Sequence, residues 1–427
     1  MGTILIKNGS LVRDGVRVAD ILIKDDYISR IGRIDRGADE TVDAEGKYVF
    51  YGFCDMHTHL REPGFTHKET VKTGAAAAAK GGFTDIFCMP NTNPVCDSEV
   101  VAEFINRRAE QAGYVRVHPV GAITKGLKGA ELSAMAGLKT AGVLAVSDDG
   151  CPVSDGAVMR RGMEYADGLG LLVLSHSEDK SLSAGGVVNE GANSVAAGLP
   201  GISRAAEEAG IARDLILAET LGIRIHICHV STRGGVELVR YFKRKGVAVT
   251  AETCPHYFAL NDACILDYNT AAKVNPPIRT EDDRKAVIEG IADGAIDVIA
   301  TDHAPHSAGE KAADFVGAPF GISGLETAFS LSYTILVQSG IIDIVKLGDL
   351  LSAAPRRITG LGGRLREGER ADITVIDPDL SWRIDAQRLV SMGKNTPFDG
   401  VKAHGMVTET IVSGRRLVRE GRLVRPC

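Results

Sequence analysis

The sequence predicts an α/β fold, a (β/α)₈ TIM-like barrel with a small β-sandwich domain formed by the N- and C-terminal segments. Two observations predict it. The central part of the chain alternates buried strand-like runs with helix-length segments, whereas both ends carry only short β-like runs. We expect the barrel to span residues 51–359 and the sandwich to combine residues 1–50 with 360–427. A chain of 427 residues is long enough for both.

The terminal segments are expected to contain strands and no helix. In the N-terminal segment the apolar runs lie at 4–6, 16–18, 21–23 and 47–50, and turn signals such as Asn8-Gly9 separate them. Similar runs return at 371–376 and 409–415. We therefore expect the two ends of the chain to meet in one domain beside the barrel.

The barrel strands are expected at eight places in the central segment. One strand precedes Asp55, and the others lie at 83–88, 115–120, 142–146, 170–174, 224–228, 247–251 and 296–300. Helix-length segments separate them, for example 73–80 and 205–221. Eight strands with crossover helices are typical of a (β/α)₈ barrel.

Composition excludes several classes of protein. No apolar run approaches the roughly 18 residues that a membrane-spanning helix needs. The net charge of −6 comes without a clustered basic stripe, so we expect no nucleic-acid partner. The N-terminus is charged where a signal peptide would be apolar, and the eight cysteines form no CxxC pair. We therefore expect a cytoplasmic protein with reduced thiols that acts on a small-molecule substrate; homo-oligomer formation is left open.

Histidines follow several of the predicted strands. His57 and His59 are two residues apart in an extended segment, so their side chains point the same way and can chelate one ion. His176, His229 and Asp302 each follow another apolar run. Each alone could be a buried side chain that is hydrogen-bonded to the backbone, but their recurrence at strand ends indicates a metal site. Imidazole with a carboxylate suits Zn²⁺ better than Mg²⁺ or Ca²⁺.

A pair of acids, Asp148 and Asp149, follows the strand at 142–146. One of the two carboxylates could bridge two metal ions. The other would then be structural and could accept hydrogen bonds from turn amides. Strand alternation alone leaves open which is which.

Six sequence runs together resemble the amidohydrolase superfamily, and within it the dihydroorotases of the bacterial long-chain type. The runs are DMHTHLREPG (55–64), MPNTNP (89–94), SDDG (147–150), HVST (229–232), VNPP (274–277) and ATDHAPH (300–306). The likeness covers nearly the whole chain. One run, residues 252–257, is also similar to hydantoinases and allantoinases.

The resemblance implies a site for two zinc ions per subunit. His57, His59 and Asp302 would hold one ion, His176 and His229 the other, and Asp149 would bridge them. Many relatives, hydantoinases among them, bridge their metals with a carboxylated lysine, and no lysine stands at the end of this strand. That favours the dihydroorotase branch.

The resemblance also implies the substrate contacts. Arg61, Asn91 and His306 would grip a carboxylate, and Asn275 with the backbone of Phe320 and Gly321 would line a pyrimidine ring; His59 and Leu60 complete the set. Arg61 also follows His59 by two residues, which would place both on the same side of an extended segment. The stretch 307–312 is expected either to be mobile and close over the substrate or to be a solvated loop.

The activity implied is the reversible, metal-dependent conversion of (S)-dihydroorotate to N-carbamoyl-L-aspartate in de novo pyrimidine (UMP) biosynthesis. A water activated by the ions would attack the ring amide, and Asp302 would move its proton to the ring nitrogen, unless it serves only as a ligand. Two other functions are weighed: a hydantoinase- or allantoinase-type cyclic amidase, and a non-catalytic homologue that is a structural partner of a pyrimidine-pathway enzyme.

Overall fold

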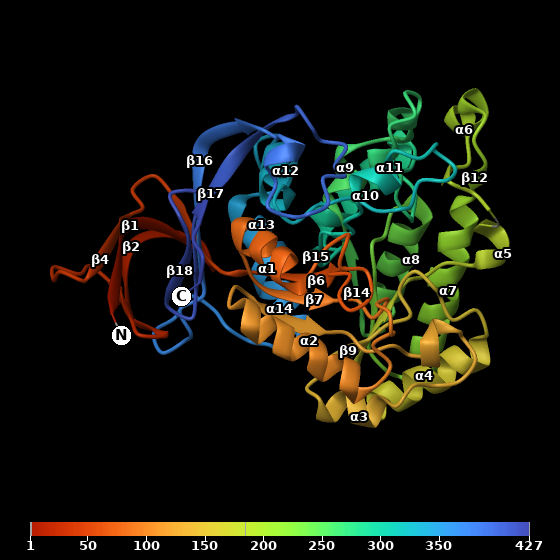
Figure 1. Ribbon diagram of the computed structural model, residues 1–427, viewed down its shortest axis with the longest axis horizontal. Coiled ribbons are helices and arrows are strands. Elements are labelled where there is room, and N and C mark those ends of the chain that lie inside the picture. The colour runs from red at the N-terminus through yellow and green to blue at the C-terminus, as the bar shows by residue number, and fades with distance from the viewer. Residues whose placement is uncertain (1, 184, 427) are drawn as a thin grey trace.

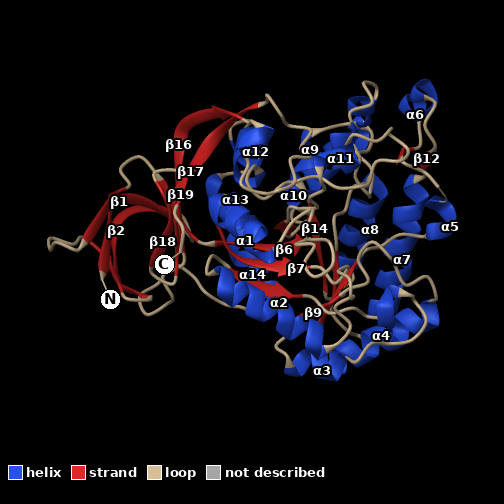
Figure 2. Ribbon diagram, in the orientation of Figure 1, coloured by secondary structure: helices blue, strands red, loops and turns tan. Residues whose placement is uncertain are grey.

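Two regions of different architecture make up the structure, a computed structural model that describes residues 2–183 and 185–426. Strands of the two terminal segments form the domain at the left of Figure 1, where both ends of the chain lie. The barrel and its helices form the larger region at the right, and Figure 2 shows the helices around its strands. In the described ranges no helix is both long and apolar enough to cross a lipid bilayer.

Eight parallel strands close into the predicted barrel. In chain order they are β6 (Phe53–Thr58), β7 (Phe83–Cys88), β8 (Arg116–Pro119), β9 (Ala145–Val146), β10 (Leu172–Ser175), β13 (Ile225–Ile227), β14 (Val249–Thr253) and β15 (Val298–Ile299). A bridge from Gly121 to Val146 joins β8 to β9, and one from Thr58 to His303 joins β6 to the segment after β15. The predicted fold class is confirmed, with a strand at each expected place.

Helices cover the outside of the barrel. They are α1 (Val71–Lys80), α2 (Glu99–Ala112), α3 (Met135–Thr140), α4 (Gly156–Gly168), α7 (Arg204–Leu221), α8 (Arg233–Arg244), α10 (Glu281–Asp293), α12 (Ala328–Ser332), α13 (Ile344–Gly348) and α14 (Ala354–Thr359). Strand alternation divides the core. In β10, Leu172 and Leu174 belong to the cluster inside the barrel, whereas Val173 packs in the cluster shared with the helices.

Short helices and strands follow the carboxyl ends of three barrel strands. After β10 come α5 (Lys180–Ser183), β11 (Val188–Asn189), α6 (Ala192–Ala197) and β12 (Gly201–Ile202); α9 (Pro255–Ala259) follows β14, and α11 (Ala308–Lys311) follows β15. The stretch 307–312 is predicted from the sequence to be either mobile, closing over the substrate, or a solvated loop. It contains α11, which Ser307 and Glu310 cap reciprocally.

The terminal segments share one nine-stranded sheet. It contains β1 (Thr3–Val12), β2 (Val16–Lys24), β3 (Tyr27–Gly32), β4 (Glu40–Asp43), β5 (Tyr48–Tyr51), β16 (Ile373–Arg383), β17 (Lys402–Val412), β18 (Arg415–Arg419) and β19 (Arg422–Leu423). Side chains of β1 to β5 pack with those of β16 and β17 in a single core. The termini therefore meet as predicted, because neither segment alone encloses that core.

The turn expected at Asn8-Gly9 is a β-bulge inside β1. The pairing with β2 shifts between Ile6 and Gly9, and Asn8 has a φ of 59°. A Cβ at Gly9 would lie 2.5 Å from a methyl carbon of Val49, so the bulge requires glycine. The runs at 16–18 and 21–23 likewise belong to one strand, β2. These two turn predictions were wrong. The bulge bends β1 without ending it, and β2 continues without a break from Val16 to Lys24.

We propose the domain division predicted from the sequence, at residues 51 and 359. Gly52 separates β5 from β6, and α14 ends at Thr359. One segment crosses this division. The connection between β16 and β17 returns to the barrel, where Asn395 bonds to the Ala304 and Gly321 carbonyls at 3.1 and 2.9 Å.

Candidate metal centre and active site

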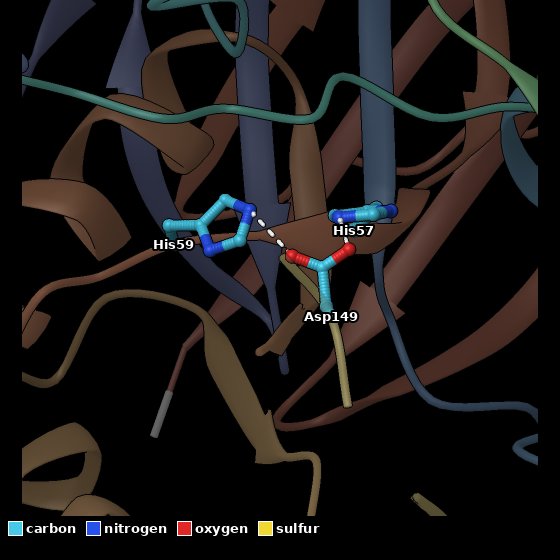
Figure 3. A group of neighbouring side chains, drawn as sticks. All are labelled: His57, His59 and Asp149. Atoms are coloured by element: carbon cyan, nitrogen blue, oxygen red, sulfur yellow. Dashed lines mark ion pairs between the residues drawn. The ribbon is translucent and has the colours of Figure 1, made fainter. Parts of the chain in front are cut away.

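The carboxylate of Asp149 lies at the centre of four imidazoles. Its Oδ1 is 3.3 Å from His57 Nε2, 3.2 Å from His176 Nδ1 and 3.5 Å from His229 Nε2, and its Oδ2 is 3.4 Å from His59 Nε2. Figure 3 shows Asp149 between His57 and His59 with one oxygen toward each. The four strands β6, β9, β10 and β13 deliver these side chains to the carboxyl end of the barrel, as expected for a site in this fold.

Asp302, which follows β15, completes the cluster from the other side. Its Oδ1 lies 3.1 Å from His59 Nε2 and 3.5 Å from His57 Nε2. Burial favours the neutral acid, but His57 and the hydrogen bond with His59 outweigh it and lower the pKa of Asp302. Burial alone would lower the pKa of His57; the carboxylates of Asp149 and Asp302 reverse this and raise it well above its usual value. The site therefore favours a positive charge between the two acids.

The donor set fits metal ions. Two groups of three residues have ligand atoms close enough to hold one ion each. The first is His57, His59 and Asp149, and the second is Asp149, His176 and His229. His57 is fully buried, and its Nε2, which faces Asp149, has no hydrogen-bond partner among the described residues. A buried nitrogen without a partner costs free energy unless a ligand takes its lone pair. Imidazole and carboxylate are the donors that Zn²⁺ and similar ions prefer.

The outer nitrogens of three histidines are held by other side chains. His57 Nδ1 is 2.7 Å from Glu252 Oε1, and His59 Nδ1 is 2.9 Å from Asn91 Oδ1. His176 Nε2 is 3.0 Å from Glu178 Oε2. Partners of this kind fix the ring and direct the lone pair of its other nitrogen toward the cluster.

Sequence reasoning missed both of these glutamates. Glu178 lies two residues beyond His176, and Glu252 lies in the run that was compared with hydantoinases. An acid two residues from a histidine at a strand end was the available signal for Glu178. No spacing links Glu252 to His57, which is 195 residues away in the chain.

Asp148 faces away from the cluster. Its Oδ1 accepts hydrogen bonds from the backbone amides of Ile123 and Thr124 at 2.8 and 3.0 Å, and its Oδ2 accepts one from the Thr124 hydroxyl. Burial, only partly offset by these bonds, raises the pKa of Asp148 to about 6. Asp148 thus has the contacts expected of the structural acid of the pair, because its carboxylate binds turn amides and not the cluster.

A cavity of about 190 Å³ opens beside the cluster. Its lining contains most of the residues predicted to contact substrate or metal, namely His59, Arg61, Asn91, Asp149, His176, His229, Asn275, Asp302, Phe320 and Gly321. Gly150, Lys180, Val274 and Ala304 complete the lining. His57, Leu60 and His306 are absent from the lining. The Leu60 side chain is fully buried in the core between barrel and helices, so it faces away from the cavity.

Arg61 reaches the cavity by a different route from the one expected. Its φ is 61°, so the chain leaves the extended conformation there and simple alternation no longer applies. The guanidinium donates from Nε to the Pro305 carbonyl at 3.2 Å, and no carboxylate of the described residues lies within ion-pair distance of it. Burial lowers the pKa of Arg61, although Asp302 and Asp149 oppose that shift. An anion that entered the cavity would find an unpaired cation.

His306 lies behind Arg61 and holds the cavity wall. Its Nε2 is 2.8 Å from the Phe320 carbonyl, and its Nδ1 is 3.4 Å from Lys68 Nζ. Burial and the positive charges of Arg61 and Lys68 lower the pKa of His306 to about 2. The neutral ring can donate from Nε2 to Phe320 and accept at Nδ1 from Lys68. His306 Nε2 also lies 3.3 Å from Arg61 Nη2, so this ring contacts two residues that line the cavity.

The wall formed by Phe320 and Gly321 is fixed from two sides. Lys311 of α11 is buried and donates to the carbonyls of Thr270, Lys273 and Pro319 at 2.9, 3.2 and 2.8 Å. Gly321 has a φ of 146°, and a Cβ there would lie 2.4 Å from the Ala304 carbonyl oxygen. The stretch 307–312 is therefore anchored to the cavity wall through Lys311.

A closed parallel barrel with four histidines and two aspartates at its carboxyl end defines an enzyme of the amidohydrolase class, with a metal cofactor. A family model described as "Dihydro-orotase-like" matches residues 46–235. A dihydroorotase of Caldanaerobacter subterraneus subsp. tengcongensis is 50% identical over 415 residues, 96% of each chain. A dihydroorotase of Pelotomaculum thermopropionicum is 49% identical over 99% of this chain and 100% of its own. The chain belongs to the dihydroorotase family.

Solved structures with the same fold are more distant in sequence. The L-hydantoinase (dihydropyrimidinase) of Arthrobacter aurescens superposes with a TM-score of 0.89 at 26% identity, covering 99% of this chain and 98% of its own. The D-hydantoinase (dihydropyrimidinase) of a Thermus species gives 0.83 at 25% identity, with 99% and 97% covered. These cyclic amidases share the barrel and the β-sandwich domain, which confirms the predicted fold class.

Proposed function

We propose that this protein is a dihydroorotase that interconverts (S)-dihydroorotate and N-carbamoyl-L-aspartate in de novo pyrimidine biosynthesis. The relatives that share about half of their sequence with this chain, over nearly the full length of both, are named for this activity. The hydantoinase of Arthrobacter aurescens shares only 26% sequence identity. One observation of the site carries the proposal. The unpaired Arg61 lies in the same cavity as the Asp149-centred cluster, which suits a cyclic amide that bears a carboxylate.

We infer that the cluster holds two zinc ions per subunit. His57, His59 and Asp302 would bind one, His176 and His229 the other, and Asp149 would bridge them. The support is that His57 with His59, and His176 with His229, each form a triad with Asp149 whose ligand atoms lie close together, so that Asp149 is common to both triads. When bound, the ions would lower the pKa of a water and polarise the ring carbonyl that this water attacks.

The protein's own groups would do the remaining chemistry. Asp302 lines the cavity and can take the proton of the attacking water, then deliver it to the departing ring nitrogen. Arg61 and Asn91 would hold the substrate carboxylate, with His306 setting the position of the Arg61 and Phe320 groups. Asn275 and the backbone at Phe320 and Gly321 would line the ring. Leu60 would act only through its backbone, since its side chain is in the core.

We place this reaction in the cytoplasm. The seven cysteines that the structure describes are all free, which suits a reducing compartment; Cys427 lies outside the described residues. Neither nucleic acid nor membrane enters the proposed reaction. Homo-oligomer formation remains an expectation that light scattering of the purified protein would test.

The deciding experiment combines metal analysis with turnover of three substrates. Purified protein should carry up to two divalent ions per chain, and prolonged chelation should abolish turnover of dihydroorotate. Hydantoin and allantoin should react poorly. Asp149→Ala should lower the occupancy of both metal positions. Activity that survives complete removal of metal, or a preference for hydantoin or allantoin, would contradict the proposal.

A further inference from the structure

One carboxylate oxygen links the metal cluster to the substrate cavity. Glu178 lies two residues beyond His176 and is 6% exposed. Its Oε2 accepts from His176 Nε2 at 3.0 Å, from Asn275 Nδ2 at 3.1 Å and from Lys180 Nζ at 2.7 Å. His176 belongs to the cluster, whereas Asn275 and Lys180 line the cavity. Glu178 therefore touches both halves of the site without lining the cavity itself.

On the metal side, Glu178 sets the tautomer of His176. A carboxylate accepts hydrogen bonds and cannot donate them, so the ring proton must be on Nε2. The lone pair is then on Nδ1, the nitrogen that lies 3.2 Å from Asp149 and 2.9 Å from His229 Nε2. A ligand nitrogen is thereby held ready for metal.

On the substrate side, the same oxygen sets the direction of the Asn275 amide. Because Glu178 only accepts, Asn275 must turn its NH₂ group toward it, which leaves Oδ1 on the other side of the amide. Oδ1 has no partner among the described residues, and Asn275 lies on the cavity wall. An acceptor is thus available to an N–H group of the ring. If the amide were free to flip, that acceptor would be replaced by a donor.

We propose that Glu178 is a positioning residue that couples metal binding at His176 to recognition of the substrate ring by Asn275. The proposal rests on the proposed function, since it assigns Asn275 to the ring. Ligand-supporting carboxylates of this kind typically change metal affinity or activity by roughly 10- to 100-fold when removed. The additional claim is that metal retention and substrate affinity both depend on this one side chain.

Glu178→Gln tests the coupling, because glutamine keeps the size of the side chain and removes its charge. We expect metal retention during dialysis against a weak chelator to fall about 10-fold or more. At saturating zinc, KM for dihydroorotate should rise while kcat changes less, since Asp302 is untouched. The matched control is Glu131→Gln, which breaks an exposed pair with Lys125 at 2.9 Å and should behave as wild type.

A second variant keeps the test decisive even if Glu178→Gln fails to fold. Asn275 makes no contact with the cluster, yet Asn275→Ala removes one of the three donors to Glu178. The coupling predicts that this variant loses metal faster than wild type in the absence of substrate. Wild-type metal retention in Asn275→Ala, or a wild-type KM in zinc-saturated Glu178→Gln, would overturn the inference.

Failure of the proposed function would look different. A wild-type protein that does not turn over dihydroorotate would contradict the proposed function. The metal-retention measurements on Glu178→Gln and Asn275→Ala need no substrate and would still decide whether the two sides of the site are coupled.

Discussion

The mouth of the barrel and the seam between the two domains both bury charged side chains, but they differ in how completely these are paired. At the seam, Asp85 receives both Arg116 and Arg356 at 2.7 and 2.6 Å, and Arg116 also reaches Asp372. Each of these charges has a partner of opposite sign in the protein. At the mouth, His57 Nε2 has no hydrogen-bond partner, and Arg61 faces no carboxylate in the described structure.

This difference in the pairing of buried groups is what distinguishes a structural ion-pair network from a site that binds ligands. Burying unpaired charge or an unpaired polar atom costs free energy, so a network that serves only stability should be complete. An incomplete network persists where a ligand supplies the missing partner. Substitutions at the mouth should therefore change chemistry with little loss of stability, and substitutions at the seam should do the reverse.

The largest effect is expected at the mouth, from Asp302→Asn. Turnover of dihydroorotate should fall by roughly 10²- to 10⁴-fold, because an amide cannot accept the proton. The thermal unfolding midpoint should stay near that of the wild type. A variant that keeps more than about a tenth of the wild-type activity would exclude the proton-transfer role and leave Asp302 as a ligand only.

Arg61→Met tests the unpaired cation through specificity. Dihydrouracil is the same ring without the carboxylate, so wild-type enzyme should process it poorly. Breaking one side of a buried charge pair costs about 2–5 kcal/mol, which is about 30-fold to several thousand-fold at ~1.4 kcal/mol per factor of ten. The variant should lose kcat/KM for dihydroorotate and little for dihydrouracil. If wild-type enzyme opens both rings equally well, Arg61 has a structural role instead.

Asp85→Asn should affect stability rather than catalysis. It leaves the buried Arg356 without its charge partner, and breaking a buried pair in this way costs roughly 3–5 kcal/mol in the free energy of unfolding. Urea denaturation measures the loss, and kcat of the folded enzyme should be unchanged. Glu103→Gln, which breaks an exposed pair with Arg107, is the control and should shift stability by less than about 0.5 kcal/mol. A comparable loss of kcat in Asp85→Asn would remove the contrast between mouth and seam.

The smallest effect is expected from Asp148→Ala, next to the proposed bridging acid. Removal of this carboxylate leaves the amides of Ile123 and Thr124 without an acceptor, at a cost of about 1–3 kcal/mol. Metal content should stay near that of the wild type, in contrast to Asp149→Ala. If Asp148→Ala loses metal and Asp149→Ala loses only stability, the choice between the two acids is reversed.

The sequence by itself determined the barrel and the face on which chemistry gathers. Strand and helix periodicity depends on residues close together in the chain, so all eight strands could be placed. The carboxyl ends of parallel strands share one end of a barrel, so His57, His176, His229 and Asp302 could be expected together without coordinates. The same runs carried the resemblance to the dihydroorotases, which the relatives confirm.

Only the tertiary structure decided where side chains point once the strands end. Arg61, His229 and Asp302 have φ values of 61°, 38° and 45°, and alternation has no predictive value where the backbone leaves the extended region. The same limit applies to the choice between Asp148 and Asp149 and to Leu60, whose side chain packs between the barrel and its helices. Contacts between distant parts of the chain were also beyond reach: Asn275 is 97 residues from Glu178, and Asn395 is 89 residues from His306. Local pattern fixes the elements, but the packing of the closed barrel selects which polar atoms meet.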